Sequence, residues 1–234
     1  MTKTAYTPVP GRHDLYRAVH RGLRLGHCQV LTRLATTDFA EPAEAREAIG
    51  ALRGYLDLAS GHLASEETKI HPAVAARDPA ALVEAEEDHA DHSRAFEELE
   101  TLCRALEDAA ADQAPAIGER LYLRYARFLG DDLHHMAEEE SQLLGALHAL
   151  FTDEELQGIE GSIVTALSWP RLCGYMGLIV GALCHRERAA MLSAMRGSMP
   201  FEVFSALLTE AVRPALSPED WARLVSTVQQ GKAA

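Results

Sequence analysis

Long stretches of this sequence place apolar or histidine residues at alternating intervals of three and four positions. In residues 12–37 the alternation runs through Tyr16, His20, Leu23 and His27. Because an α-helix has about 3.6 residues per turn, this spacing lines the side chains along one face. The pattern predicts packed α-helices, and the low aromatic content of 6% favours helices over strands.

Short breaks divide the first part of the chain into four predicted helices. They cover residues 12–37, about 43–77, about 79–110 and about 115–150, with proline or small polar residues at the breaks. Short connections make sequential helices antiparallel neighbours. We therefore expect an all-α fold whose first part is an up-down-up-down four-helix bundle.

The character of the sequence changes near residue 151. Shorter helical segments follow, several of them with a proline near the start, where proline is tolerated. This part shows no spacing typical of metal ligands. The expected domains are the bundle over residues 1–151 and a helical C-terminal extension over residues 152–234. The extension would pack on the bundle or on a partner chain, as in a homo-oligomer.

The second and fourth predicted helices contain the same short peptide. The stretch around His62 and Glu66 aligns without gaps with the stretch around His135 and Glu139. Each copy contains His-x-x-x-Glu, whose spacing places both side chains on one face about a turn apart. Neighbouring aromatic and aliphatic residues turn that face toward the core. A buried His and Glu are costly unless they are satisfied, so two matching pairs favour a shared cation.

The lengths of the predicted helices show which other histidines lie at the same depth along the bundle as the histidines of the repeated motif. Measured from the connection between the first two helices, His20 lies about 26 Å and His62 about 28 Å away. His89 and His135 lie about 31 Å and about 30 Å from the connection between the last two helices. His27 is about 13 Å out of register with His62, so we expect it to be a rim or core histidine.

The predicted metal site combines four imidazoles and two carboxylates, from His20, His62, Glu66, His89, His135 and Glu139. Four nitrogens and two potentially bridging carboxylates suit two close divalent metals. A donor set without thiolate fits iron or manganese and also accepts zinc. A ferritin-like site would need two Glu-x-x-His motifs, and only Glu86-x-x-His89 matches, so that site is disfavoured.

The charge of the chain excludes several classes of partner. The net charge of −13 argues against binding to nucleic acids and to anionic membranes.

No apolar run is long enough to cross a bilayer, and the N-terminal residues lack the apolar core of a signal peptide. We therefore expect a cytoplasmic protein, whose four cysteines, without CxxC spacing, stay reduced.

Four stretches together resemble the hemerythrin-like (HHE cation-binding) family. They are AVHRGLR around His20, HLASEETKIHP around His62, EEDHADH around His89 and HHMAEEESQLL around His135. The resemblance implies a left-handed bundle around two non-haem iron ions, bridged by carboxylates and by an oxo or hydroxo group. It is associated with reversible oxygen binding, with sensing of oxygen or nitric oxide, and with iron or redox homeostasis. The region after about residue 150 resembles the extension of one bacterial branch.

One position departs from the family pattern. Respiratory members carry His-x-x-x-His on the third helix, whereas Ser93 stands four residues after His89 here. His92 points about 100° away from Ser93 and is only a reserve ligand. The missing imidazole implies a more open position on one metal, which favours ligand sensing or redox turnover over simple oxygen carriage.

Three functions remain open from the sequence. The first is a di-iron protein that binds O2, NO or peroxide for sensing or for redox and iron homeostasis. The second is a di-iron oxidase or peroxidase-like enzyme. The third is a metal-free helical interaction module.

Of the remaining histidines, His71 is expected in the core or at the surface, and His13 and His148 are expected to be exposed.

Overall fold

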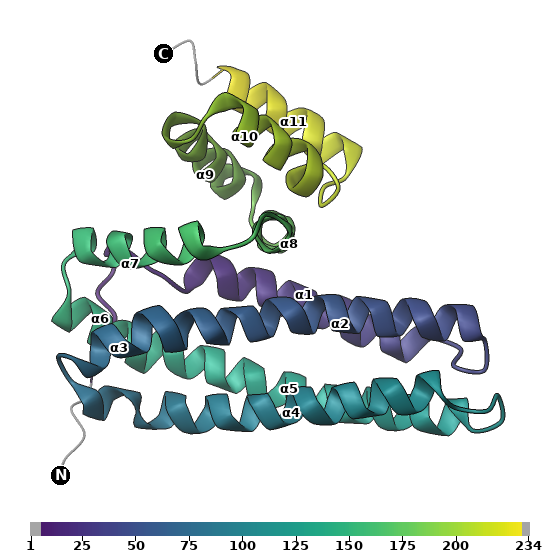
Figure 1. Cartoon of the computed structure of the whole chain (residues 1–234). Coiled ribbons are helices and arrows are strands. Elements are labelled where there is room, and N and C mark those ends of the chain that lie inside the picture. Colours follow the sequence, from purple (N-terminus) through teal and green to yellow (C-terminus); the bar gives the residue numbers. More distant parts are fainter. Residues whose placement is uncertain (1–5, 231–234) are drawn as a thin grey trace. The chain divides into compact units, whose positions relative to one another are not determined.

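The computed structural model describes residues 6–230, except for the side chains of Val83, Glu84, Glu86, Glu87, Gln229 and Gln230. Glu86, which the comparison with ferritin-like sites used, thus lies outside the described side chains. Over the described residues the structure is all-helical and has no strand, which confirms the predicted fold class (Figure 1). None of these helices is long and apolar enough to span a membrane.

Four long helices form the bundle that the sequence predicts. They are α1 (Arg17–Thr36), α2 (Pro42–Ser65), α4 (Val83–Glu107) and α5 (Ala114–Glu138), and short connections link α1 to α2 and α4 to α5 (Figure 1). Contacts between α2 and α4 and between α4 and α5 hold neighbouring helices together. The all-α bundle thus follows from the alternation of apolar positions and from the short connections.

The first helix begins five residues later than the sequence predicts. The carboxylate of Asp14 accepts hydrogen bonds from the backbone N–H groups of Tyr16 and Arg17, at 3.0 and 2.9 Å. These N–H groups open α1 and have no carbonyl partner within the helix, so the aspartate caps it. The guanidinium of Arg12 instead donates to the carbonyl oxygens of His148 and Phe151, which fixes the chain before α1 in a non-helical path.

The two copies of the repeated peptide also share a backbone feature that the sequence does not predict. The α-helical part of α2 gives way to a π-helical turn, Glu66–Ile70, before α3 (His71–Ala75) continues. In the same way, α5 gives way to the π-helical turn Glu139–Leu143 before α6 (Leu144–Leu150). Each π-helical turn therefore begins at the glutamate of a His-x-x-x-Glu motif. Such turns are frequent at functional sites.

An apolar cluster closes one end of the bundle beyond the π-helical turns. Ile70 and Leu143, each four residues after a motif glutamate, are 2% and 3% exposed. They pack with Val74, Leu147 and Leu156, the last of which comes from α7 (Asp153–Ala166). A 3₁₀ turn, Pro79–Leu82, leads from α3 into α4. This cluster separates the motif residues from solvent at that end.

The remaining helices have an apolar core of their own. They are α8 (Trp169–Ala182), α9 (His185–Ser198), α10 (Phe201–Leu207), a π-helical turn (Leu208–Val212) and α11 (Pro218–Gln230). Contacts group them, with Ala18–Leu25 of α1, into a second unit, while α7 belongs to the first. The contacts thus divide the chain after Ala166. The domain boundary at residue 151 stays a prediction. A homo-oligomer formed through these helices also stays a prediction.

Candidate metal centre

Three helices of the bundle bring buried imidazoles and carboxylates together. His62 lies in the last turn of α2, and Glu66 opens the π-helical turn that follows. His135 and Glu139 hold the same places at the end of α5, and His89 comes from α4. These five residues are between 1% and 9% exposed. Five of the six predicted ligands therefore lie in the core of the first unit.

The two carboxylates connect imidazoles from different helices. Glu66 Oε1 lies 3.2 Å from His62 Nε2, and Glu66 Oε2 lies 3.4 Å from His89 Nε2. Glu139 Oε2 lies 3.5 Å from His135 Nε2, and its Oε1 lies 4.0 Å from His89 Nε2. Each glutamate thus directs its two oxygens toward two different imidazoles.

The ligand atoms form two overlapping groups. In one, Glu66, His89, His135 and Glu139 each offer an atom within 4.8 Å of the others. In the other, His62 joins the same two glutamates within the same distance. Both carboxylates belong to both groups, and either group of atoms could hold a cation. Mixed imidazole and carboxylate donors without thiolate suit iron, manganese or zinc.

Several of these atoms have no hydrogen-bond partner within the protein. Both carboxylate oxygens of Glu66 and the Nε2 atoms of His89 and His135 are buried and form no hydrogen bond. Leaving a buried polar atom without a partner costs about 1–3 kcal/mol. A cation bound among these atoms would satisfy them together, so the residues present fit a metal centre better than a closed hydrogen-bond network.

Burial governs the electrostatics of the centre when no cation is bound. Burial, and then the charge of Glu139, raises the pKa of Glu66 well above its usual range. Burial, and then the neighbouring His135, lowers the pKa of His89. Both shifts favour neutral groups. A bound cation reverses this balance for the carboxyl group, because it stabilises the carboxylate directly.

Two carboxylates outside the centre orient the imidazoles. His89 Nδ1 donates a hydrogen bond to Glu67 Oε1 at 3.2 Å, and His135 Nδ1 donates one to Asp88 Oδ2 at 3.3 Å. A proton held on Nδ1 leaves the lone pair of Nε2 free to bind a metal. Glu67 directly follows Glu66 in the π-helical turn. Asp88 was missed, because it lies on α4 and reaches across to a histidine of α5.

The remaining candidate positions have different environments. Ser93 is exposed on α4, so it supplies no ligand in place of the missing imidazole. His92 is buried, its Nδ1 lies 3.5 Å from Asp132 Oδ1, and it belongs to neither group of ligand atoms. His20 is fully buried on α1, in the segment that contacts assign to the second unit. Its role as a ligand stays a prediction.

His27 is a core histidine, as its depth along the helix predicts. Its Nε2 donates a hydrogen bond to Asp132 Oδ2 at 2.6 Å, and its Nδ1 accepts one from the hydroxyl of Tyr125 at 3.0 Å. Asp132 is 4% exposed. Sequence reasoning missed this buried carboxylate, although its place three residues before His135 on α5 is a signal that could have been used.

His148 and His71 are both buried. The expectation that His148 is exposed was wrong, because it is only 6% exposed. Its Nδ1 accepts a hydrogen bond from the N–H of Val9, and its Nε2 donates to the carbonyl of His13, so it anchors the N-terminal segment. His71 is a core residue, also 6% exposed, and its ring centre lies 4.8 Å from that of His89.

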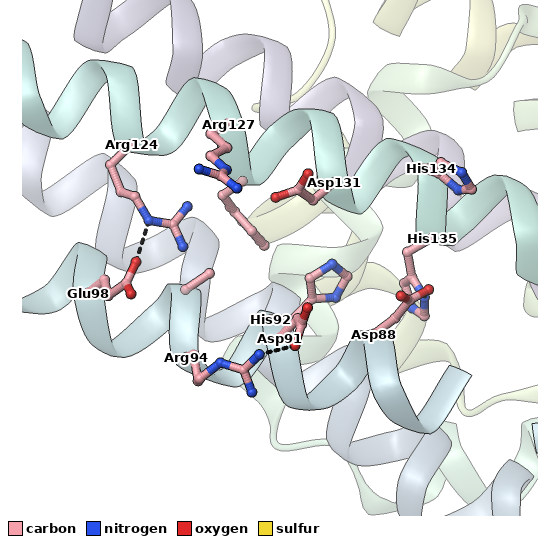
Figure 2. A pocket seen from close by; sticks show the side chains of 12 residues that line it. Asp88, Asp91, His92, Arg94, Glu98, Arg124, Arg127, Asp131, His134 and His135 are labelled. Carbon is pink, nitrogen blue, oxygen red and sulfur yellow. Dashed lines mark hydrogen bonds and ion pairs between the residues drawn. The ribbon is translucent and has the colours of Figure 1, made fainter. Parts of the chain in front are cut away.

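A cavity of about 570 Å³ lies between α4 and α5, and His92 and His135 form part of its wall. Figure 2 shows Asp88 beside His135, and Arg124 at the other end of the cavity, where it pairs with Glu98 across the two helices. The cavity therefore borders the side of His135 that carries the hydrogen bond to Asp88. It brings solvent to the outer edge of the candidate centre.

Comparison with known proteins agrees with this geometry. Residues 13–147 match the model of the hemerythrin HHE cation binding domain, and this stretch contains all six predicted ligands. No curated protein and no solved structure matches the chain. The match covers more than half of the sequence and includes the bundle that carries the buried His and Glu groups. The chain therefore belongs to the hemerythrin HHE cation-binding domain family.

Proposed function

We propose that the bundle holds two iron ions and uses them to bind O2, NO or peroxide, for sensing or for redox and iron homeostasis. The observation that carries the proposal is the pair of buried ligand groups that share Glu66 and Glu139. Iron at such positions supplies a redox-active Lewis acid to a small ligand. The proposed ligands are His20, His62, Glu66, His89, His135 and Glu139.

His20 is the proposed fourth imidazole. It lies on the same helix as His27, seven residues earlier, and a separation of seven residues is close to two full turns. Since His27 is directed into the bundle core toward Asp132 and Tyr125, the periodicity of α1 directs His20 toward the same side. His20 would complete the ligand set that His62 begins.

The proposed ligand set leaves a coordination position for an external molecule. Ser93 is exposed, so α4 offers one imidazole where the respiratory pattern has two. The apolar side chains of Ile70 and Leu143 close the bundle beyond the glutamates and keep bulk water away. A shielded position that the protein does not fill suits a small ligand better than a large one.

An oxidase or peroxidase-like enzyme is the second candidate. The observation that favours it is the cavity between α4 and α5, which borders His135 and is large enough for a small organic molecule. Oxygen uptake that depends on an added reducing substrate, with many turnovers per protein, would support this function. A single oxidation per protein would support ligand binding or sensing.

Metal analysis of protein purified without chelator tests the proposal. We expect iron in the wild-type protein, sharply less iron in His62→Ala and His135→Ala, and wild-type iron in His134→Ala. His134 is a matched control, because it is exposed and adjacent to His135 on α5. Equal iron in all four proteins would contradict the proposed ligands, and a wild-type protein without metal would favour the interaction module.

The reaction with oxygen tests the open position. Protein reduced without oxygen is mixed with air and followed by absorbance. Immediate conversion to the ferric form supports a sensing or redox role. An oxygen adduct that persists for hours and releases oxygen under vacuum would indicate an oxygen carrier instead.

A further inference from the structure

His71 has a buried polar atom for which the protein offers no partner. It is the first residue of α3, directly after the π-helical turn that Glu66 opens, and it is 6% exposed. Its Nε2 is buried and forms no hydrogen bond. A leucine or phenylalanine would fill the same space without burying such an atom. A histidine at this place therefore leaves a buried polar atom available to a bound molecule.

His71 lies beside the candidate metal centre. The ring of His71 packs against that of His89, with ring centres 4.8 Å apart and an angle of 32° between the planes. The ring of His89 in turn lies 5.0 Å from that of His135. His71 is thus next to a proposed ligand and inside the same water-poor core. Sequence reasoning placed it in the core or at the surface and gave it no role.

His71 itself does not belong to the ligand set. Neither group of atoms close enough to hold a cation includes one of its nitrogens. An imidazole next to a metal centre, but outside its ligand set, is placed to make a hydrogen bond to whatever occupies an open coordination position. Such donors and acceptors decide which small molecule a metal site retains.

We propose that His71 Nε2 forms a hydrogen bond to the small external ligand at the centre, and so determines how tightly that ligand is held. The proposal rests on the proposed function, since it requires a metal with an open position. The class of ligand is a diatomic molecule or small anion with an oxygen or nitrogen atom that can take part in a hydrogen bond. His71 is therefore a ligand-binding residue without being a metal ligand.

Azide, a small anion that binds open positions on ferric iron, is the probe for the test. Iron-loaded ferric protein is titrated with azide and followed by absorbance, for the wild type, His71→Leu, His71→Gln and His134→Ala. We expect His71→Leu to keep the wild-type iron content but to bind azide about three- to tenfold more weakly, as for the loss of one hydrogen bond. His71→Gln should recover part of the affinity, and His134→Ala should match the wild type.

The alternatives give different results. An iron content in His71→Leu and His71→Gln well below that of the wild type would show that His71 is a metal ligand and would overturn the proposal. Unchanged azide affinity in His71→Leu would overturn it as well, with the proposed function intact. A wild-type protein that takes up no metal would overturn the proposed function and this inference with it.

Discussion

At the scale of single residues, the candidate centre depends on which nitrogen of each histidine carries the proton. Asp88 and Glu67 accept hydrogen bonds from the Nδ1 atoms of His135 and His89, which leaves both Nε2 atoms available. Carboxylate–histidine–metal arrangements of this kind fix the orientation of the ring and strengthen the ligand. The two carboxylates therefore support the centre from outside its ligand groups.

Replacing Asp88 should weaken iron binding without unfolding the protein. We expect Asp88→Ala to lower iron affinity about 10- to 100-fold, because His135 would lose the group that fixes its proton and ring orientation. Competition with a chelator of known affinity measures this change. Asp91→Ala is the matched control, since Asp91 is exposed on the same helix and pairs with Arg94. Equal affinities in both variants would show that Asp88 has no role in orienting His135.

The sequence predicted some of these residues and not others. The duplicated His-x-x-x-Glu motif leads to His62, Glu66, His135 and Glu139, because both members of each pair lie on one helix. Asp88 acts on a different helix from its own, so finding it requires the relative rotation of α4 and α5. The unpartnered nitrogen of His71 likewise appears only once neighbouring helices are packed around it.

At the scale of helices, the periodicity of the sequence predicts the bundle and misses its interruptions. Residues 43–77 and 115–150 read as continuous helices, because apolar residues keep recurring at helical spacing through them. The structure inserts a π-helical turn at Glu66 and another at Glu139. A π-helical turn alters the register by one residue only, which a pattern with alternating intervals of three and four does not distinguish.

Helix packing near the connection between α1 and α2 depends on one glycine. A Cβ atom added to Gly118 of α5 would lie 2.2 Å from the ring of Phe39, which comes from that connection and is 8% exposed. Gly118→Ala should therefore destabilise the protein by about 1–3 kcal/mol, despite the better helix propensity of alanine. Urea unfolding followed by circular dichroism measures the change.

Gly130 on the same helix is the matched control. Nothing lies within 4 Å of a Cβ atom added there. Gly130→Ala should stabilise the protein by about 0.5–1 kcal/mol, because alanine loses less backbone freedom than glycine on folding. A stabilising effect of the same size at both positions would contradict the close packing of Phe39 on α5.

At the scale of the whole molecule, metal binding and folding are linked. The folded bundle gathers Glu66, His89 and His135, which have buried atoms without a hydrogen bond, whereas an unfolded chain holds them apart. A ligand that binds only the folded state stabilises that state. The apolar cluster beyond the π-helical turns and the separate core of α8 to α11 do not depend on a cation.

Removing the metal should lower the melting temperature. With free metal at about 100 times its dissociation constant, binding contributes about 2.7 kcal/mol to the stability of the folded state. For a chain of this size that corresponds to a shift of about 5–10 °C. Calorimetry of metal-loaded and metal-free protein in the same buffer measures it. Identical melting temperatures after complete removal of the metal would show that the buried groups bind no cation.

The central proposal is a site in which Glu66 and Glu139 would help to hold two cations, and the ratio of iron to protein tests it most directly. Protein reconstituted with ferrous iron without oxygen, and then freed of excess iron, should hold about two ions per chain. Because each glutamate belongs to both groups of ligand atoms, Glu66→Ala should lose both ions and not just one. A wild-type ratio near zero, or a Glu66→Ala variant with the wild-type ratio, would contradict the account.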